Sequence, residues 1–223
     1  ERMARVLNIR DLRVHFKDAA PDRFAVDGLN LSIQEGEILG LVGESGSGKT
    51  VTAMSVSGLL PRDKAEVSGS ISLDGQEIFS CTDKEMLNIL GDKLGVVFQE
   101  PMTSMDPVMT IGPQVEECLK NHSRLNRAER LRRALEALDQ ADLPDPERIY
   151  RQYPHELSGG MLQRVMIAAA IVSRPRLLLA DEPTTALDVS VQAEILALLK
   201  KLNREQGMAI LMISHDLNVV RRL

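Results

Sequence analysis

The spacing of hydrophobic and polar residues changes along the chain and predicts its elements. Residues 5–16, RVLNIRDLRVHF, alternate apolar and polar side chains, and GLNLSI at 28–33 does the same. A period of two is typical of strands with one solvated face, so an antiparallel pair is expected here. GSISLDGQEI at 69–78 places Asp74 and Gly75 between two alternating segments, which is a strong hairpin signal. The sequence therefore predicts an antiparallel β subdomain at the front of the chain.

Later segments show a different pattern, a short run of consecutive apolar residues. Such a run is typical of a strand that is buried on both faces, as in a parallel sheet. The runs are EILGLVG at 37–43, KLGVVFQ at 93–99, RLLLADE at 176–182 and MAILMIS at 208–214. After the first of them, the residues from Lys49 to Pro61 predict a helix.

Helical spacing of apolar residues takes over at residues 111–171. Within this stretch, Leu131, Leu135 and Leu138 share one face of a predicted helix. Asn126 precedes that helix and is placed to cap it. The middle of the chain is therefore predicted to be an all-helical block.

One more amphipathic helix is predicted before the last strand. It is expected to stop near Gly207, and its apolar face is formed by Val191, Ile195, Leu198 and Leu202. The order of elements predicts a single α/β domain over residues 1–223, with a mostly parallel sheet and an N-terminal antiparallel β subdomain. The helical subdomain, at about residues 102–173, is inserted before the second half of this core.

Composition narrows the classes of partner. The 223 residues, 43% of them hydrophobic, are enough for one sizeable core. The net charge is −5 and the isoelectric point about 5.5, which argues against nucleic acid as a partner, because a phosphate backbone requires an excess of Lys and Arg. Cys81 and Cys118 lie far from each other and from histidines at ligand spacing, so we expect buried thiols in a reducing compartment. No apolar run approaches the ~20 residues of a membrane-spanning helix.

A glycine-rich segment, GESGSGKT at 43–50, carries the first candidate chemistry. Gly43, Gly46, Gly48, Lys49 and Thr50 match the phosphate-loop pattern between a predicted strand and a predicted helix. Glycines allow successive N–H groups to point at phosphate oxygens, and the helix N-terminus adds partial positive charge. In such a loop the lysine reaches the β and γ phosphates and the threonine hydroxyl ligates Mg²⁺. The alternative, a glycine-rich turn that binds nothing, does not explain the strand-loop-helix context.

Carboxylates follow the third apolar run. Asp181 and Glu182 stand at its carboxyl end, where ligands of open α/β sheets collect. If the backbone is extended there, the two side chains point to opposite sides, so that one serves Mg²⁺ and the other acts as general base. His215 and Gln99 end two other predicted strands and are candidates for the γ-phosphate and for Mg²⁺ or water. A histidine near a helix start remains an equal interpretation of His215.

A second glycine-containing segment, LSGGMLQR at 157–164, opens another helix. Ser158 is predicted to be its N-cap, and Gly159 and Gly160 leave bare N–H groups at its positive end. In isolation this pattern is typical of an ordinary capped helix. Together with the phosphate loop it predicts a second anion site, which lies on the inserted block and reaches nucleotide only in a head-to-tail partner.

The motifs in this order resemble the nucleotide-binding subunit of an ABC transporter. They are the phosphate loop, VVFQ, LSGGMLQR, LLLADEP, TALD and ISHD, and they extend over nearly the whole chain. The resemblance implies a P-loop NTPase core that binds ATP and Mg²⁺ and hydrolyses the ATP. It implies ATP contacts for Gly43, Glu44, Ser45, Gly46, Ser47, Gly48, Lys49, Thr50, Val51 and Gln99. It also implies Mg²⁺ contacts for Thr50, Gln99 and, through water, Asp181, with Glu182 as catalytic base and His215 as γ-phosphate switch.

The same resemblance assigns residues to a dimer interface and to the adenine. Ser158, Gly159 and Gly160 are expected on the partner's ATP, and Asp188 of TALD across the interface. An aromatic residue before the phosphate loop stacks on adenine in this family. Phe16 fits that place better than Phe24, with plain packing as the alternative for either, and stacking contributes about 1–3 kcal/mol in comparable sites.

Three longer segments of the sequence resemble those of one branch of this family, the ATPases of dipeptide, oligopeptide and nickel importers. The segments are FQEPMTSMDPVMTIGPQ, SGGMLQRVMIAAAI and DEPTTALDVSVQAEIL. Met102, Met105 and Met109 fall in a loop that the family uses to touch membrane subunits, although gap filling by methionine is an equal interpretation. The implied partners are a second ATP-binding subunit, identical or related, two transmembrane permease subunits and, indirectly, a solute-binding protein. The implied location is the cytoplasmic face of the inner membrane.

Two other functions are compatible with the sequence motifs. A soluble ABC ATPase acting on nucleic acid or ribosomes has the same nucleotide motifs, but it is expected to add basic arms, zinc cysteines or a second cassette. A regulatory module without turnover does not need Glu182 and His215. The chain ends at DLNVVRRL where the family continues, so we expect it to be C-terminally shortened.

Overall fold

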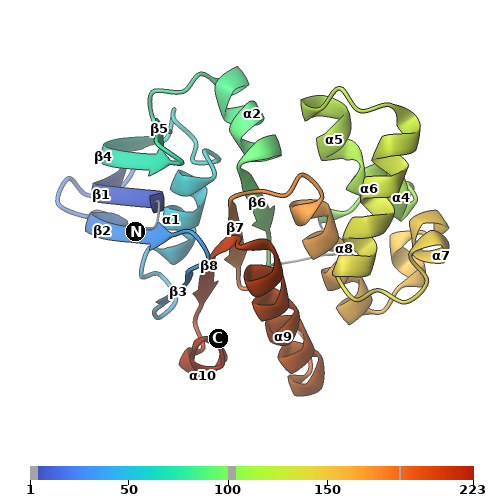
Figure 1. Cartoon of the computed structure of the whole chain (residues 1–223). Helices are drawn as coiled ribbons and strands as arrows, with labels where there is room; N and C mark the ends of the chain where they lie inside the picture. Colours follow the sequence, from blue (N-terminus) through green and yellow to red (C-terminus); the bar gives the residue numbers. More distant parts are fainter. Residues whose placement is uncertain (1–4, 100–103, 186) are drawn as a thin grey trace.

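Two sheets and a block of helices make up residues 5–99, 104–185 and 187–223, which the computed structural model describes. The sheets lie on one side of the molecule and the helical block on the other (Figure 1). Each sheet has four strands, in the orders β2-β1-β4-β5 and β3-β8-β7-β6. The predicted α/β architecture, with an antiparallel front sheet and an inserted helical block, is confirmed.

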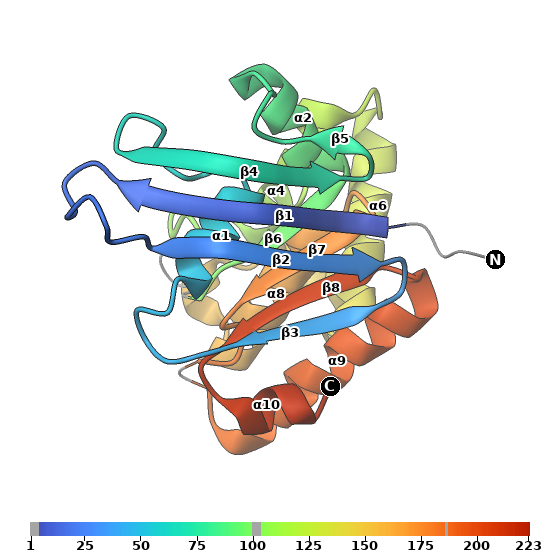
Figure 2. The same cartoon turned by 90° about the vertical axis from the view of Figure 1, so that its left-hand side faces the viewer.

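The front sheet is antiparallel, as the period of two predicted. β1 (Arg5–Phe16) pairs with β2 (Val26–Gln34) on one side and with β4 (Ala65–Leu73) on the other (Figure 2). A two-residue turn joins β4 to β5 (Gln76–Glu77). Asp74 and Gly75 of this turn have φ angles of 48° and 80°, and two positive angles in succession match the twist of a tight hairpin.

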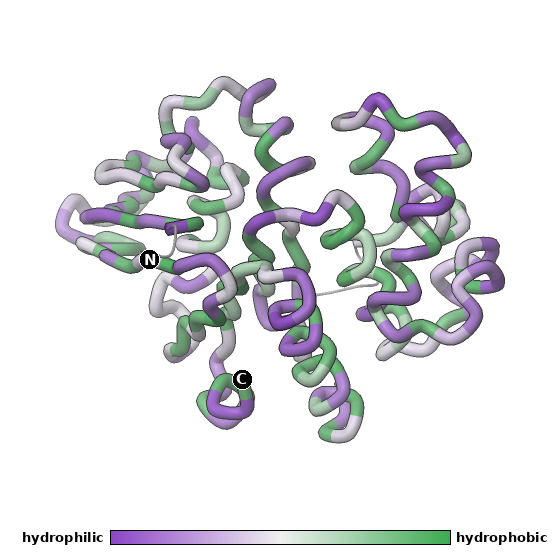
Figure 3. Tube along the Cα trace, viewed as in Figure 1, coloured by the Kyte–Doolittle hydropathy of each residue, from purple (hydrophilic) through white to green (hydrophobic). Residues whose placement is uncertain are grey.

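The central sheet is parallel and separates two hydrophobic cores. Its strands are β3 (Ile38–Val42), β6 (Leu94–Val97), β7 (Leu177–Asp181) and β8 (Ala209–Ser214). Along β7, Leu177 and Leu179 enter the core shared with the front sheet, whereas Leu178 enters the core shared with the helical block. Apolar residues accordingly gather in the middle of the molecule (Figure 3). β7 and β8 are the doubly buried strands that their apolar runs predicted.

β3 departs from its prediction. Its residues are only partly buried, with Gly40 exposed, although the apolar run EILGLVG predicted burial on both faces. β3 lies at the end of the described parallel sheet and pairs with β8 alone. The short helix α10 (Leu217–Arg221) packs against it so closely that a Cβ on Gly40 would lie 2.1 Å from Val220 Cγ1. An apolar run therefore predicted the strand but not its edge position.

α1 (Lys49–Val56) packs in the core shared by the two sheets. The helix ends at Val56 with Ser57 as its C-cap, and Gly58 follows with a φ of 68°, so the helix is shorter than the one predicted to extend to Pro61. A Cβ on Gly58 would lie 2.7 Å from Met86 Cγ, which makes this a turn that glycine alone fits without a shift.

The helices of the inserted block follow one another through short loops. They are α4 (Ile111–Val115), α5 (Glu117–His122), α6 (Arg127–Gln140), α7 (Pro146–Arg151), the 3₁₀ turn η1 (Pro154–Glu156) and α8 (Gly159–Ile171). α2 (Asp83–Asp92) precedes β6, and α9 (Val189–Gln206) ends at Gly207 in the left-handed conformation, as predicted. Residues 102 and 103 of the predicted subdomain lie outside the described residues.

α6 confirms the predicted cap but not the whole predicted face. Asn126 Oδ1 accepts the Glu129 N–H at 3.0 Å and Glu129 Oε2 accepts the Asn126 N–H at 2.8 Å, a complete capping box. Leu138 is fully buried, but Leu131 is 38% exposed. The buried face is formed with Ala134 and Ala137, because small side chains let α6 approach α8.

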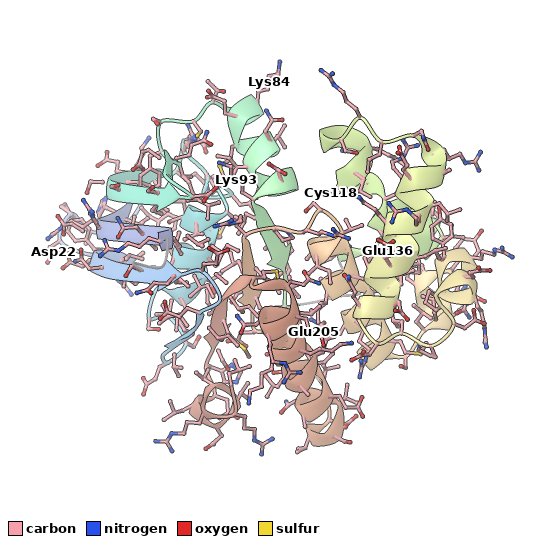
Figure 4. All side chains as sticks on the ribbon, in the orientation of Figure 1. Asp22, Lys84, Lys93, Cys118, Glu136 and Glu205 are labelled. Carbon is pink, nitrogen blue, oxygen red and sulfur yellow. The ribbon has the colours of Figure 1, made fainter. Side chains whose placement is uncertain are left out.

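The two cysteines are free, as predicted, but only Cys81 is buried. Cys118 of α5 is partly exposed, and its Sγ donates to the carbonyl oxygen of Gly91 in α2 at 3.0 Å. It therefore lies where the helical block meets α2 (Figure 4). Among the described residues, no helix is both long and apolar enough to cross a bilayer.

Candidate functional site

The loop between β3 and α1 is shaped by its glycines. A Cβ on Gly43 would lie 2.6 Å from Ser47 Oγ, and one on Gly48 would lie 2.3 Å from the carbonyl oxygen of Ala25. Gly46 and Gly48 have φ angles of 81° and 86°, which side chains rarely adopt. The path of the loop therefore requires glycine at these places, as the phosphate-loop pattern predicts.

α1 begins with exposed backbone donors. Its N-cap is Gly48, which supplies no side-chain acceptor, and its first turn holds no acidic residue. The N–H groups of a helix start carry partial positive charge and need acceptors. The start of α1 is consequently suited to an anion.

Lys49 points its ammonium into the loop. Its Nζ donates to the carbonyl oxygens of Gly43 at 2.6 Å and Glu44 at 2.8 Å, and lies 3.4 Å from Ser47 Oγ. The residue is buried, and among the described residues no carboxylate forms an ion pair with it. A buried cation held only by neutral oxygens gains from a phosphate, because the phosphate oxygens add an opposite charge beside it.

One cavity of about 480 Å³ joins this loop to the carboxyl ends of the parallel strands. It brings together many of the predicted residues, namely Ser45, Gly46, Gly48, Lys49, Thr50, Val51, Gln99, Glu182 and His215. Ala25 and Thr185 also line it and were not predicted. Thr185 lies within the motif DEPTTALD, so it could have been predicted from the sequence. Ala25 belongs to no recognised motif and could not have been.

Asp181 and Glu182 do not alternate as an extended strand. β7 ends at Asp181, and Glu182 has a φ of 50°. The opposite arrangement of the two side chains was predicted for an extended backbone, and the backbone is not extended at Glu182. The left-handed backbone turns the chain sharply at Glu182. Glu182 N–H still donates to the carbonyl oxygen of Ile213 at 2.9 Å, which ties the turn to β8.

The two carboxylates have opposite pKa shifts. Burial raises the pKa of Asp181 and the neighbouring charge of Glu182 raises it further, against a lowering effect of Lys49. Burial alone raises the pKa of Glu182, but hydrogen bonds from His215 and Thr185 and the charges of His215 and Lys49 outweigh it and lower the pKa. The lowered pKa therefore keeps the Glu182 carboxylate ionised.

Glu182 binds two donors through one oxygen. His215 Nδ1 lies 2.7 Å from Glu182 Oε2, and Thr185 Oγ1 donates to the same oxygen at 2.8 Å. An ionised carboxylate only accepts, so Nδ1 carries a hydrogen in this pair. The side chain of Glu182 is 15% exposed and that of His215 is 58% exposed. The histidine is thus the more exposed partner of a partly buried carboxylate.

Oxygen donors for a divalent cation are present beside the loop. Thr50 offers a hydroxyl and Gln99 an amide oxygen at the cavity, and Asp181 ends the adjoining strand. Hydroxyl, amide and carboxylate oxygens are the ligands that Mg²⁺ prefers, together with water and substrate phosphates. Among the described residues no three His, Cys, Asp or Glu side chains gather to hold a metal by themselves. The donor set fits a cation that is shared with a bound phosphate.

The residues predicted for the dimer interface do not line this cavity in the part of the chain described. Ser158 caps α8, with its Oγ accepting the Met161 N–H at 3.3 Å, and Asp188 caps α9, with Oδ1 accepting the Val191 N–H at 3.0 Å. Both are exposed, as is Gly159, and none lines the cavity among the residues described. A Cβ on Gly160 would lie 2.7 Å from Val191 Cγ1, so the starts of α8 and α9 are adjacent.

The two candidate aromatic residues lie at the end of the front sheet. Phe16 is partly buried against the core of that sheet, and Phe24 is 40% exposed with its ring edge-on to His15 at 5.6 Å. Neither is among the described residues that line the cavity. Stacking of Phe16 on a base therefore stays a prediction.

A second hollow, a groove of about 390 Å³, lies between the central sheet and the helical block. Its apolar lining includes Leu59, Leu90, Phe98, Met105 and Met166. Met105 is buried, whereas Met109 is exposed, and Met102 lies outside the described residues. Of the three methionines, one is therefore buried beside the groove and one lies at the surface.

The family model described as "ABC transporter" matches residues 26–185 of the chain. This range runs from β2 past the phosphate loop to the turn after Glu182 and covers most of the chain. The protein belongs to the ABC transporter family.

Curated relatives place it more closely. The chain is 46% identical over 216 residues to a probable peptide ABC transporter ATP-binding protein of Sinorhizobium fredii, covering 96% of this chain and 64% of the relative. It is 45% identical to the dipeptide transport ATP-binding protein DppD of Escherichia coli, covering 96% and 66%. It is 47% identical to the oligopeptide transport ATP-binding protein OppD of the same organism, covering 96% and 64%. The chain spans just under two thirds of the length of these relatives.

Solved structures agree on the fold. A dimeric bacterial ABC transporter cassette superposes with a TM-score of 0.82 at 35% identity, covering 97% of this chain and 90% of that one. A dimeric post-hydrolysis state of an ATP-binding cassette bound to ADP and Pi gives the same TM-score and identity, again covering 97% and 90%.

Proposed function

We propose that this chain binds and hydrolyses ATP as the nucleotide-binding part of an ABC importer. The observation that carries the proposal is that the phosphate loop, Glu182 and His215 line the same cavity. A phosphate cradle alone would serve binding. A partly buried, ionised carboxylate in the same cavity adds a proton acceptor for an attacking water.

Phosphates of the nucleotide would be held by the loop of residues 43–48 and by the start of α1. Lys49 exchanges its carbonyl partners for phosphate oxygens, and the N–H groups of Thr50 and Val51 add further donors. Thr50, Gln99 and Asp181 are the residues that would hold Mg²⁺. When bound, this ion neutralises charge on the phosphates.

Glu182 acts as the general base on a water beside the γ-phosphate. Its lowered pKa keeps the carboxylate ionised near neutral pH. His215 donates through Nδ1 to Glu182. No hydrogen bond of its second ring nitrogen is seen among the described residues, and a protonated ring can donate through that nitrogen to a phosphate oxygen. These roles follow the resemblance and agree with the geometry.

The second anion site acts on a partner. Ser158 and the glycines after it lie at an exposed helix start, outside the cavity of their own chain. A second cassette, identical or related, can bring the same helix start onto the nucleotide of this one in a head-to-tail dimer, with Asp188 in the interface. The dimeric form of a structural neighbour supports this arrangement.

Two permease subunits are the proposed membrane partners. The apolar groove with Phe98 and Met105 is a suitable docking place, because apolar lining and methionine adapt to a helix from another subunit. We place the protein at the cytoplasmic face of the inner membrane, held there by these subunits. The solute-binding protein is reached only through them.

Peptides are the favoured cargo. The relatives above carry peptide, dipeptide and oligopeptide names, which favours peptides over nickel. Uptake of labelled dipeptide and of radioactive nickel by cells with and without the gene tests this choice. Nickel uptake that depends on the gene, with no effect on peptide, would reverse it. The soluble alternative, an ATPase acting on nucleic acid or ribosomes, is disfavoured by the same relatives.

Replacement of Lys49 by alanine tests the phosphate site. Because Lys49→Ala removes the buried cation of the loop, we expect the affinity for ATP, measured by calorimetry, to fall about tenfold or more. Lys84→Ala, at an exposed lysine of α2, is the matched control and should bind like the wild type. Equal affinity of wild type and Lys49→Ala would remove the loop from nucleotide binding.

A further inference from the structure

We propose that Thr185 is the positioning residue of Glu182, an inference that rests on the proposed function. Its hydroxyl donates to Glu182 Oε2 at 2.8 Å and lies in the wall of the same cavity. The sequence motifs assign roles to the carboxylate and the histidine but none to Thr185.

The two donors on Oε2 give the two oxygens of the Glu182 carboxylate different roles. Thr185 Oγ1 and His215 Nδ1 both bind this oxygen, at 2.8 and 2.7 Å. Among the described residues no hydrogen bond reaches Oε1 of Glu182. Oε2 is therefore the anchored oxygen, and Oε1 is the one available to take a proton from water.

The threonine is the fixed donor of the pair. The side chain of His215 is 58% exposed and comes from the neighbouring strand end, so it can leave Glu182 for another acceptor. Thr185 belongs to the same turn as Glu182, and its own N–H donates to the carbonyl oxygen of Glu182 at 3.2 Å. When the histidine turns away, the threonine still holds the carboxylate.

The turn itself is anchored from α9. Gln192 Nε2 donates to the carbonyl oxygens of Thr184 at 3.2 Å and Leu187 at 3.3 Å. Glu182 has a left-handed backbone, which surrounding bonds have to maintain. Backbone and side-chain bonds of Thr185 close that turn, so the orientation of Glu182 is set by a short segment fastened to a long helix.

Paired substitutions test the role. Thr185→Val keeps the shape of the side chain and removes the hydroxyl, and Thr185→Ser keeps the hydroxyl. In the intact protein we expect Thr185→Val to lower kcat for ATP about 10- to 100-fold, the loss typical of one hydrogen bond to a charged group. The KM for ATP and nucleotide binding should stay unchanged, and Thr185→Ser should restore most of kcat.

Thr184→Val is the matched control. It makes the same change at the neighbouring buried threonine, for which no hydrogen bond to Glu182 is seen in the part of the chain described. The proposal is overturned by an unchanged kcat in Thr185→Val, by a serine variant as slow as valine, or by an equal loss in Thr184→Val. A wild type that hydrolyses ATP separates these outcomes from failure of the proposed function, whereas a wild type without turnover overturns both.

Discussion

At the scale of single residues, Glu182 depends on its backbone as much as on its carboxylate. The left-handed φ of 50° places it in a turn, where a residue of another element, His215, and one of its own turn, Thr185, both reach Oε2. A glutamate in an extended strand cannot meet a donor three residues later in this way. Its identity was readable from DEPTTALD, but its conformation was not.

Replacing this base should separate binding from chemistry. Glu182→Gln keeps the shape of the side chain but removes the charge that accepts a proton, so we expect hydrolysis to slow about 10²- to 10⁴-fold with ATP binding retained. Steady-state turnover and calorimetry measure the two effects. Glu205→Gln, at an exposed residue near the end of α9, is the control. Turnover at the wild-type rate in Glu182→Gln would remove Glu182 from the mechanism.

Tyr150 of α7 gives a residue-scale test of the helical block. Burial raises its pKa from 10.0 to about 12, helped by the hydrogen bond to Glu116 and the charge of that residue, and opposed by Arg127 and Arg130. The Tyr150 hydroxyl donates to the buried Glu116 Oε1 at 2.5 Å. A folded pKa above the unfolded one means that stability from this group is complete below pH 10 and is lost as the pH rises through about 12.

An absorbance titration checks this shift. The chain has two tyrosines and no tryptophan, so Tyr153→Phe leaves Tyr150 as the only phenol. We expect tyrosinate to appear at about pH 12 in the folded variant, with folding followed by circular dichroism. The same variant unfolded in denaturant should titrate near the ordinary value of tyrosine. Folded protein that titrates like the unfolded chain would contradict the buried hydrogen bond.

At the scale of elements, local signals fixed where helices begin and packing fixed which side they bury. The capping box at Asn126 and Glu129 is a local exchange of hydrogen bonds, and it was predictable from the sequence. The buried face of α6 depends on α8, which approaches over Ala134 and Ala137 and leaves Leu131 exposed. The leucine spacing predicted a face formed by Leu131, Leu135 and Leu138, whereas the buried residues of α6 are Ala134, Ala137 and Leu138.

Removing the cap should destabilise the helical block. Asn126→Ala leaves the Glu129 N–H without its acceptor, so we expect the free energy of unfolding to fall by about 1 kcal/mol. Urea unfolding measures the loss. Asn126→Asp keeps a cap acceptor and adds charge that favours a helix start, so it should match or exceed the wild type. No difference between the alanine variant and the wild type would show that the cap carries no net stability.

At the scale of the whole molecule, the two proposed anion sites lie on different parts of the fold. The phosphate loop belongs to the central sheet, whereas Ser158 begins the last helix of the inserted block (Figure 1). The adjacent starts of α8 and α9 are held together by Arg164, whose guanidinium donates to Glu194 Oε2 at 2.8 Å. The proposed interface residues Ser158 and Asp188 therefore lie at neighbouring helix starts.

Dimerisation is the test at this scale. Ser158→Arg places a long cation at the start of α8, so we expect loss of the ATP-dependent dimer with monomer binding of ATP retained. Sedimentation velocity with and without nucleotide measures the dimer. Ser68→Arg, at an exposed serine of β4 in the front sheet, makes the same change elsewhere and should dimerise normally. A full dimer in Ser158→Arg would contradict the shared-site arrangement.

Elements that depend on neighbours along the chain were predictable from the sequence. The turn at Asp74 and Gly75, the cap at Asn126 and the glycine loop all follow from local backbone and side-chain chemistry. Tertiary structure decided what depends on residues distant in sequence. It made β3 an edge strand, because no described strand pairs beyond it, and it brought His215 to Glu182, because β7 and β8 are parallel and end together. Pairing, burial and the meeting of side chains are set by packing between elements, and a pattern along one chain does not contain that information.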